Sequence, residues 1–202
     1  MKARLGRTIP HFEQVDLSDT RAVFSSDRLY RYRLSMSYLN SMFDKARANQ
    51  LAVILKNPSA ADAGLADATI RKVETFVYHR FPDVRVIHIL NIFAYRATDP
   101  GDLNRVFAQE GAVAVIGEEN DRVIAETLEQ CQYIIPAWGN RSGIDEALYR
   151  ERVYRVKILL AAVPRQKLFV VRGRAQTKEP LHGLMWGYRY DVEPAPIQLL
   201  EV

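Results

Sequence analysis

Three side chains lie where short apolar runs end in turns. Their chemistry suits a site that binds the polar edge of a ligand or stabilises a leaving group. Asn57 and Asn91 each follow an apolar run, and His182 lies in a loop after another such run. An asparagine amide can hold a water or pair with an amide edge, although it cannot remove a proton as a carboxylate does. An imidazole can donate a hydrogen bond to negative charge that develops on a leaving group.

Both asparagines also have a structural explanation. An Asn-Pro pair such as Asn57-Pro58 forms turns. A buried asparagine such as Asn91 can bond to neighbouring backbone, because an unmet buried polar group costs about 1–3 kcal/mol. Of the acids nearby, Asp67 is better explained as a helix cap than as a base. Asp62 shows no evident structural role in the sequence, so it is a candidate for the site.

The elements that must position these side chains alternate along the chain. Apolar runs at 51–56, 84–93, 133–139 and 167–172 predict strands, and helical patterns at 67–80, 118–130 and 143–162 lie between them. Successive strand–helix–strand units imply an α/β fold of three layers, α/β/α, with a central and mainly parallel four-stranded sheet. Parallel strands release their loops at one edge, where ligands bind. That edge carries Asn57, Asn91, Trp138-Gly139 and His182.

The remainder of the chain predicts one domain with an N-terminal extension. Residues 1–27 show no clear period and are predicted to form an irregular arm, whereas residues 28–202 are predicted to form a single α/β domain. The stretch 30–36 alternates apolar and polar residues, which predicts a half-buried strand at the edge of the sheet. With 202 residues, of which 48% are hydrophobic and 26% charged, the chain suits one globular core.

The composition and the absence of known motifs exclude several classes of protein. A single cysteine, Cys131, rules out an internal disulfide and a thiolate zinc cluster. No metal-ligand spacing, dinucleotide fingerprint, P-loop or G-x-S-x-G occurs, so we predict no metal and no other cofactor. No apolar run reaches the roughly 18 residues of a membrane span, and the N-terminus lacks the core of a secretion signal. We therefore expect a cytoplasmic protein without a membrane partner.

The charge of the chain permits an anionic partner. The net charge is +4, which is compatible with a nucleotide or nucleic acid but does not require one. Arg172 ends the last predicted strand and is placed to steer a phosphate. An ordinary basic surface explains the same charge equally well.

Several motifs, taken in order, resemble a known family. They are Arg31-Tyr-Arg-Leu, Leu55-Lys-Asn57-Pro58-Ser59-Ala-Ala-Asp62, Asp67-Ala-Thr69-Ile-Arg71, Asn91-Ile-Phe-Ala-Tyr-Arg96-Ala-Thr98-Asp99-Pro100 and Ala137-Trp138-Gly139. Over residues 28–187 they resemble the bacterial and phage family called domain of unknown function 1643, which has no established activity. The chain departs from the family pattern at Lys56, where a small or apolar residue is usual. It departs again at Gly183, where a second proline usually follows the histidine.

A more distant resemblance is to the uracil-DNA glycosylase superfamily. This resemblance implies an α/β/α fold in which Asn57-Pro58 positions the attacking water and Asn91 reads the base. His182 matches only the histidine of the last motif, which in that superfamily continues into proline and serine. Phe93 or Trp138 would stack on a flipped base.

These observations define a function and a site to look for in the structure. The resemblance implies cleavage of an N-glycosidic bond in DNA or in a nucleotide. The alternatives are a non-catalytic binder of nucleotide or nucleic acid and a protein-interaction module. The catalytic candidates are Asn57, His182 and Asp62, and the substrate-binding candidates are Pro58, Ser59, Asn91, Phe93, Arg96, Trp138, Gly139 and Arg172.

Overall fold

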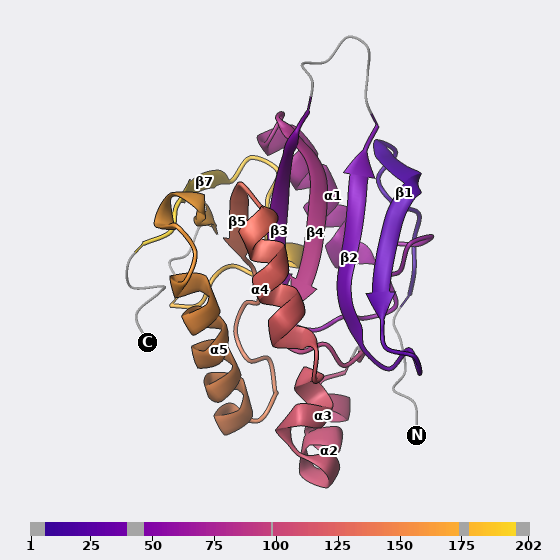
Figure 1. Cartoon of the computed structure of the whole chain (residues 1–202), viewed down its shortest axis with the longest axis vertical. Coiled ribbons are helices and arrows are strands. Elements are labelled where there is room, and N and C mark those ends of the chain that lie inside the picture. Colours follow the sequence, from indigo (N-terminus) through magenta and orange to yellow (C-terminus); the bar gives the residue numbers. More distant parts are fainter. Residues whose placement is uncertain (1–6, 40–46, 98, 174–177, 197–202) are drawn as a thin grey trace.

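The computed structural model describes residues 7–39, 47–97, 99–173 and 178–196 and shows a mixed sheet with helices on both faces (Figure 1). The five strands lie in the order β1 (Val15–Phe24), β2 (Arg31–Tyr38), β4 (Val84–Asn91), β3 (Asn49–Leu55) and β5 (Tyr133–Pro136). β3 runs parallel to β4 and to β5, whereas β2 is antiparallel to both β1 and β4. The predicted α/β class is therefore confirmed.

The sheet differs from the predicted four-stranded parallel one at the fourth strand. β6 (Phe169–Arg172) pairs with β7 (Asp191–Pro194) in a separate antiparallel sheet. A single parallel bridge between Ile134 and Leu168 holds this second sheet beside β5. β7 belongs to the C-terminal segment, whose mixed aromatic and proline composition hides its short strand.

The prediction for the N-terminal region is wrong at two points. Residues 15–24 form β1 instead of part of an irregular arm, and this strand occupies the sheet edge that the sequence pattern predicts for residues 30–36. β2 lies inside the sheet between β1 and β4. β1 escaped the period-2 pattern because most of its side chains are not buried and its register shifts between Asp16 and Arg21. Residues 1–6 of the predicted arm and Thr98 of the family motif lie outside the described residues.

The three predicted helices are confirmed. They are α1 (Ala68–Arg80), α4 (Asn120–Gln130) and α5 (Glu146–Ala161), and the short helices α2 (Pro100–Glu110) and α3 (Ala112–Ile116) follow β4. Two 3₁₀ turns complete the fold, η1 (Arg165–Lys167) and η2 (Gly183–Met185). No helix in the described part of the chain is long and apolar enough to cross a membrane.

α1 begins where the sequence predicts, because the carboxylate of Asp67 accepts a hydrogen bond from the backbone N–H of Ile70 at 2.9 Å. Its buried side chains pack on one face of the sheet, and those of α4 and α5 pack on the other. The apolar residues of β3 alternate between these two cores, so the strand is covered on both sides.

The path of the chain changes direction at β3. The α1 crossover leads from β3 to its neighbour β4 and packs on one face of the sheet. The next crossover, which contains α4, leads from β4 to β5 and packs on the opposite face, and β5 lies on the other side of β3 from β4. The loops that leave β3 and β5 therefore diverge. In open α/β sheets such a switch point at the carboxyl ends of the strands is where ligands bind.

A buried arginine fixes the backbone just after β4. The Arg152 side chain of α5 is only 1% exposed, and its Nε donates to the carbonyl of Ile92. Its guanidinium also forms an ion pair of 2.5 Å with Asp121 of α4. Asn120, which is fully buried, donates to the carbonyls of Asn91 and Ile92. Together these bonds satisfy the strand end that faces α4 and α5.

We expect Arg152→Leu to lower the free energy of unfolding by about 1–3 kcal/mol, because it removes the buried guanidinium that donates to the Ile92 carbonyl and pairs with Asp121. Arg155→Leu is the matched control, since Arg155 pairs with the same Asp121 but its side chain is 57% exposed. The control should change stability by less than about 1 kcal/mol. Urea unfolding of both variants measures this difference, and equal losses would contradict the assignment.

Candidate functional site

A pocket of ≈ 480 Å³ lies at the switch point between β3 and β5. Three segments that are far apart in the sequence form its wall. They are Lys56 directly after β3, the group Gly139, Asn140 and Ser142 after β5, and the group Glu179, Pro180, Leu181, His182, Leu184 and Met185 between β6 and β7. The volume lies in the range of small-molecule sites. The predicted edge therefore does carry a pocket, and Gly139 and His182 are the predicted residues that line it.

Lys56 places a nearly buried ammonium in this pocket. The residue is 8% exposed, and its amine has no hydrogen-bond or ion-pair partner among the described residues. Burial lowers its pKa to about 8, because a charged amine loses its hydration in the pocket wall. At neutral pH the group is still mainly cationic, so an anionic group of a ligand would supply the missing partner.

His182 faces the same pocket as a neutral imidazole. Burial lowers its pKa to about 4; the positive charge of Lys56 lowers it further, while Asp67 opposes the shift. The Nδ1 atom accepts a hydrogen bond from the backbone N–H of Leu184 at 3.2 Å. The proton of the neutral ring is therefore assigned to Nε2, which makes this nitrogen a hydrogen-bond donor.

Two glycines allow the His182 loop to approach the strand ends. Gly139 has a φ of +69°, and a Cβ at this position would lie 2.8 Å from the Cβ of His182. A Cβ on Gly183 would lie 2.9 Å from side-chain atoms of both Leu55 and Val73. The Gly183 N–H also donates to the carbonyl of Ala137 at 3.3 Å, a bond that proline cannot make.

Asn57 does not line the pocket, although its neighbour Lys56 does. Its Nδ2 donates to the carbonyl of Ala97, and the Ala97 N–H donates to the carbonyl of Pro58 at 3.0 Å. The Ser59 hydroxyl donates to Asp67, the cap of α1. The Asn-Pro-Ser motif therefore joins the loop after β3 to the loop after β4 and to the start of α1.

Asn91 is also absent from the pocket wall, because it is 1% exposed beneath neighbouring structure. Its Oδ1 accepts from Arg31 at 3.4 Å, and its Nδ2 has no hydrogen-bond partner in the described part of the chain. Arg31 is equally buried and also donates to the carbonyl of Ala61 at 2.7 Å. Burial lowers the pKa of Arg31 to about 10. Arg31 and Asn91 are thus bonded to each other, and Arg31 also bonds to the backbone of the loop after β3.

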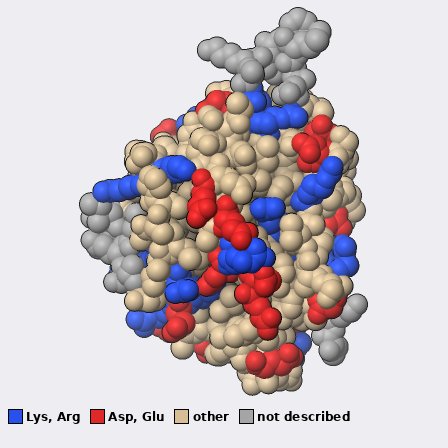
Figure 2. All heavy atoms as spheres, viewed as in Figure 1, with Lys and Arg blue, Asp and Glu red and all other residues tan. Residues whose placement is uncertain are grey.

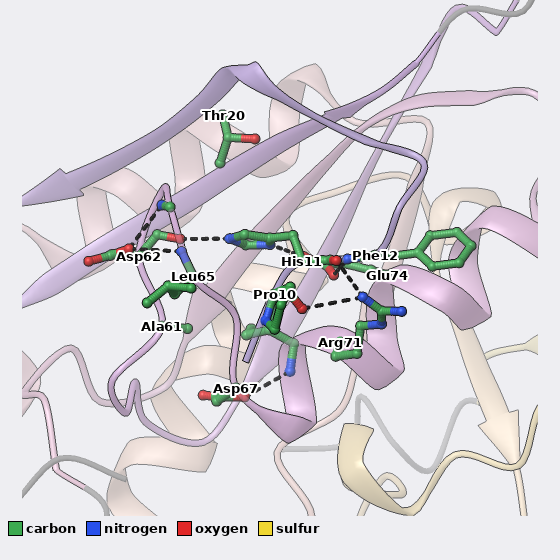
Figure 3. A network of polar contacts seen from close by, with 12 residues as sticks. Pro10, His11, Phe12, Thr20, Ala61, Asp62, Leu65, Asp67, Arg71 and Glu74 are labelled. Carbon is green, nitrogen blue, oxygen red and sulfur yellow. Dashed lines mark hydrogen bonds and ion pairs between the residues drawn. The ribbon is translucent and has the colours of Figure 1, made fainter. Parts of the chain in front are cut away.

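Asp62 has a structural role that the sequence did not reveal. Its Oδ1 accepts from the backbone N–H groups of Gly64 and Leu65 at 2.9 and 3.1 Å, and these bonds shape the turn (Figure 3). Its carbonyl accepts from Nε2 of His11 at 3.0 Å. The expectation that Asp62 lacks a structural role is therefore wrong.

The N-terminal segment holds this loop against α1 through a buried ion pair (Figure 3). Nδ1 of His11 lies 2.5 Å from Oε1 of Glu74, and the N–H of Phe12 donates to Oε2 at 2.8 Å. Both ring nitrogens of His11 thus face acceptors, the Glu74 carboxylate and the Asp62 carbonyl, so the ring is an imidazolium. Burial opposes this charge, but the hydrogen bond and charge of Glu74 outweigh it and raise the pKa of His11.

The other predicted binding residues also lie outside the pocket wall. Phe93 and Trp138 are fully buried in the core, so neither ring is exposed for stacking on a base. Arg96 donates to the carbonyls of Ser59 and Ala60 at 3.4 and 3.5 Å. Arg172 forms an ion pair of 2.8 Å with Glu193 across β6 and β7.

The sequence missed the residue that dominates the chemistry of the pocket. Lys56 is a lone cation at the end of an apolar run and departs from the family pattern, and both signals were visible. Asn140, Ser142 and Met185 have no comparable signal, because only the fold brings their loops to the pocket. Among the described residues, no group of three or more His, Cys, Asp or Glu side chains is arranged to hold a metal ion.

Comparison with known proteins agrees with the motifs. The family model described as "Protein of unknown function (DUF1643)" matches residues 31–184, and the chain belongs to this family. No curated protein and no solved structure matched the chain.

Stability should depend on pH through His11. Because its folded-state pKa is raised above 6.5, its contribution is fully present below pH 6.5 and is lost as pH rises through the folded-state pKa. We expect Glu74→Gln to lower stability and to flatten this dependence, whereas His79→Gln, an exposed position of α1, should leave it unchanged. Urea midpoints over a pH series measure the effect. A wild-type midpoint that rises steadily from pH 6 to pH 9 would contradict it.

Gly183→Ala should lower stability by about 1–3 kcal/mol, because the added methyl overpacks the contact with Leu55 and Val73. Gly64→Ala is the matched control, since the nearest atom to its Cβ is at the ordinary distance of 3.7 Å. Thermal unfolding compares the two variants. A Gly183→Ala protein as stable as the control would show that the loop does not pack as described.

Proposed function

We propose that the protein is a glycosylase-like enzyme that hydrolyses the N-glycosidic bond of a nucleoside or nucleotide in this pocket. One observation carries the proposal: the Lys56 ammonium and the neutral His182 imidazole line the same pocket at the switch point of the sheet. Both groups favour negative charge, and the base that leaves such a bond carries the bonding electron pair.

The proposed chemistry assigns one role to each side chain. The bond between the sugar C1′ and the base nitrogen breaks, and its electron pair leaves with the base. The oxygen of a water bonds to C1′, and the proton that this water loses ends on the departing base. The Nε2–H of His182 donates to an oxygen of the departing base, and Lys56 attracts its negative charge. Asn57, which the sequence suggested for orienting the water, lies outside the pocket wall, so the proposal assigns no side chain to that role.

A small ligand suits the pocket better than a DNA duplex does. The volume of ≈ 480 Å³ is that of a small-molecule site. Figure 2 shows acidic and basic side chains interleaved on the face that carries α4 and α5. Several of them pair with each other, as Arg122 does with Glu119 and Glu126. A duplex needs an extended basic surface, and this face does not offer one.

Binding without catalysis is the second candidate, and the acids favour it. The carboxylate of Asp62 bonds to its own turn. Glu179, the carboxylate of the pocket wall, accepts from the indole N–H of Trp138 at 3.0 Å. Because both carboxylates are engaged in these bonds, hydrolysis would have to proceed without a carboxylate base. A protein that only binds its ligand needs no such base.

We expect free base to be released from one or more nucleoside 5′-monophosphates, and chromatography of the incubated mixture measures this. Lys56→Met and His182→Ala should each lower release by roughly 10²–10³-fold, and release should fall above about pH 8 as Lys56 loses its proton. Lys72→Met and His79→Ala, both on α1 and outside the pocket wall, are the controls. Thermal stabilisation by the same nucleotides without base release would support the second candidate. The absence of both stabilisation and base release would contradict both candidates.

A further inference from the structure

Lys56 has more chemistry available than electrostatic attraction. Lys56 lines the pocket directly after β3 and is nearly buried, and its amine is not hydrogen-bonded to any described residue. A lysine held in this way is a nucleophile whenever it is unprotonated, because no neighbouring donor engages its lone pair and no acceptor fixes its protons.

We propose that the Lys56 amine forms an imine with the open-chain aldehyde of a sugar bound in the pocket. The inference rests on the proposed function, since hydrolysis of an N-glycosidic bond yields a sugar with a hydroxyl on C1, and this sugar equilibrates with its aldehyde. The ligand class is therefore an aldose, and for nucleotide substrates it is a pentose phosphate.

The step balances without an oxidant or a second reactant. The lone pair of Nζ adds to the aldehyde carbon, the C–N bond forms and the electrons of the C=O π bond move to oxygen. The two amine protons are transferred to that oxygen, which leaves as water, and the C=N bond forms. The Nε2–H of His182 is placed to polarise the aldehyde by donating to its oxygen.

The surroundings of Lys56 favour the reactive form of the amine. Three titratable groups face it or its partner: His182 and Glu179 from the segment between β6 and β7, and Asp67 from the start of α1. Glu179 is bonded to Trp138 and Asp67 caps α1. Burial holds the pKa of Lys56 at about 8 instead of 10.5. This leaves on the order of a hundredfold more free amine at neutral pH than an ordinary lysine has.

Borohydride reduction in the presence of D-ribose 5-phosphate tests the proposal on the full-length chain. We expect one covalent adduct per chain, mapped to Lys56 by peptide mass analysis, with a rate at least tenfold above that of the exposed lysines and half-maximal near pH 8. Lys56→Arg should abolish the adduct and keep the charge, Lys72→Arg should retain it, and His182→Ala should slow its formation.

Adducts spread evenly over exposed lysines, or an adduct at Lys56 that appears only near pH 10.5, would overturn the proposal. Assays of base release on the same preparation separate the two claims. Base release by a protein that gives no Lys56 adduct overturns the imine alone. An adduct at Lys56 without base release supports the imine and overturns the proposed hydrolysis.

Discussion

The divergence of the chain at β3 is the constraint on which the site depends. β3 is buried between β4 and β5, and its two neighbouring crossovers lie on opposite faces of the sheet. No helix can cover the point where the loops separate, so a pocket remains at the carboxyl ends of β3 and β5. Lys56 is the first residue beyond β3, and its side chain therefore lies in the pocket wall by topology.

Several buried groups hold the loop that follows Lys56 in one arrangement. His11 and Glu74 attach it to the N-terminal segment and α1, Arg31 supports the carbonyl of Ala61, and Asn57 joins it to Ala97. These polar groups are costly to bury and are almost all paired with charge or backbone, which fixes one arrangement. The asparagines thus organise the loop, and the positively charged lysine and the neutral histidine are left to contact a ligand.

Local patterns predicted the parts of this molecule that depend on local physics. The apolar runs gave the positions of β3 and β4, Asp67 marked the start of α1, and parallel strands implied a loop edge that bears the pocket. The sequence does not predict the edge strand at its true position, because most side chains of β1 are not buried and its register is irregular. Asn91 was expected at the ligand, yet its environment depends on Arg31, which lies 60 residues away in the sequence. Such pairings are set by the tertiary structure, and neither residue's neighbours in the sequence indicate them.

A crystal structure with a bound nucleoside 5′-monophosphate tests the central claim most directly, because it shows which atoms contact the ligand. The account predicts the base between the ends of β3 and β5, with an oxygen within hydrogen-bond distance of Nε2 of His182 and the Lys56 ammonium beside it. A nucleotide bound elsewhere on the protein, or in the pocket without contact to either side chain, would contradict the account.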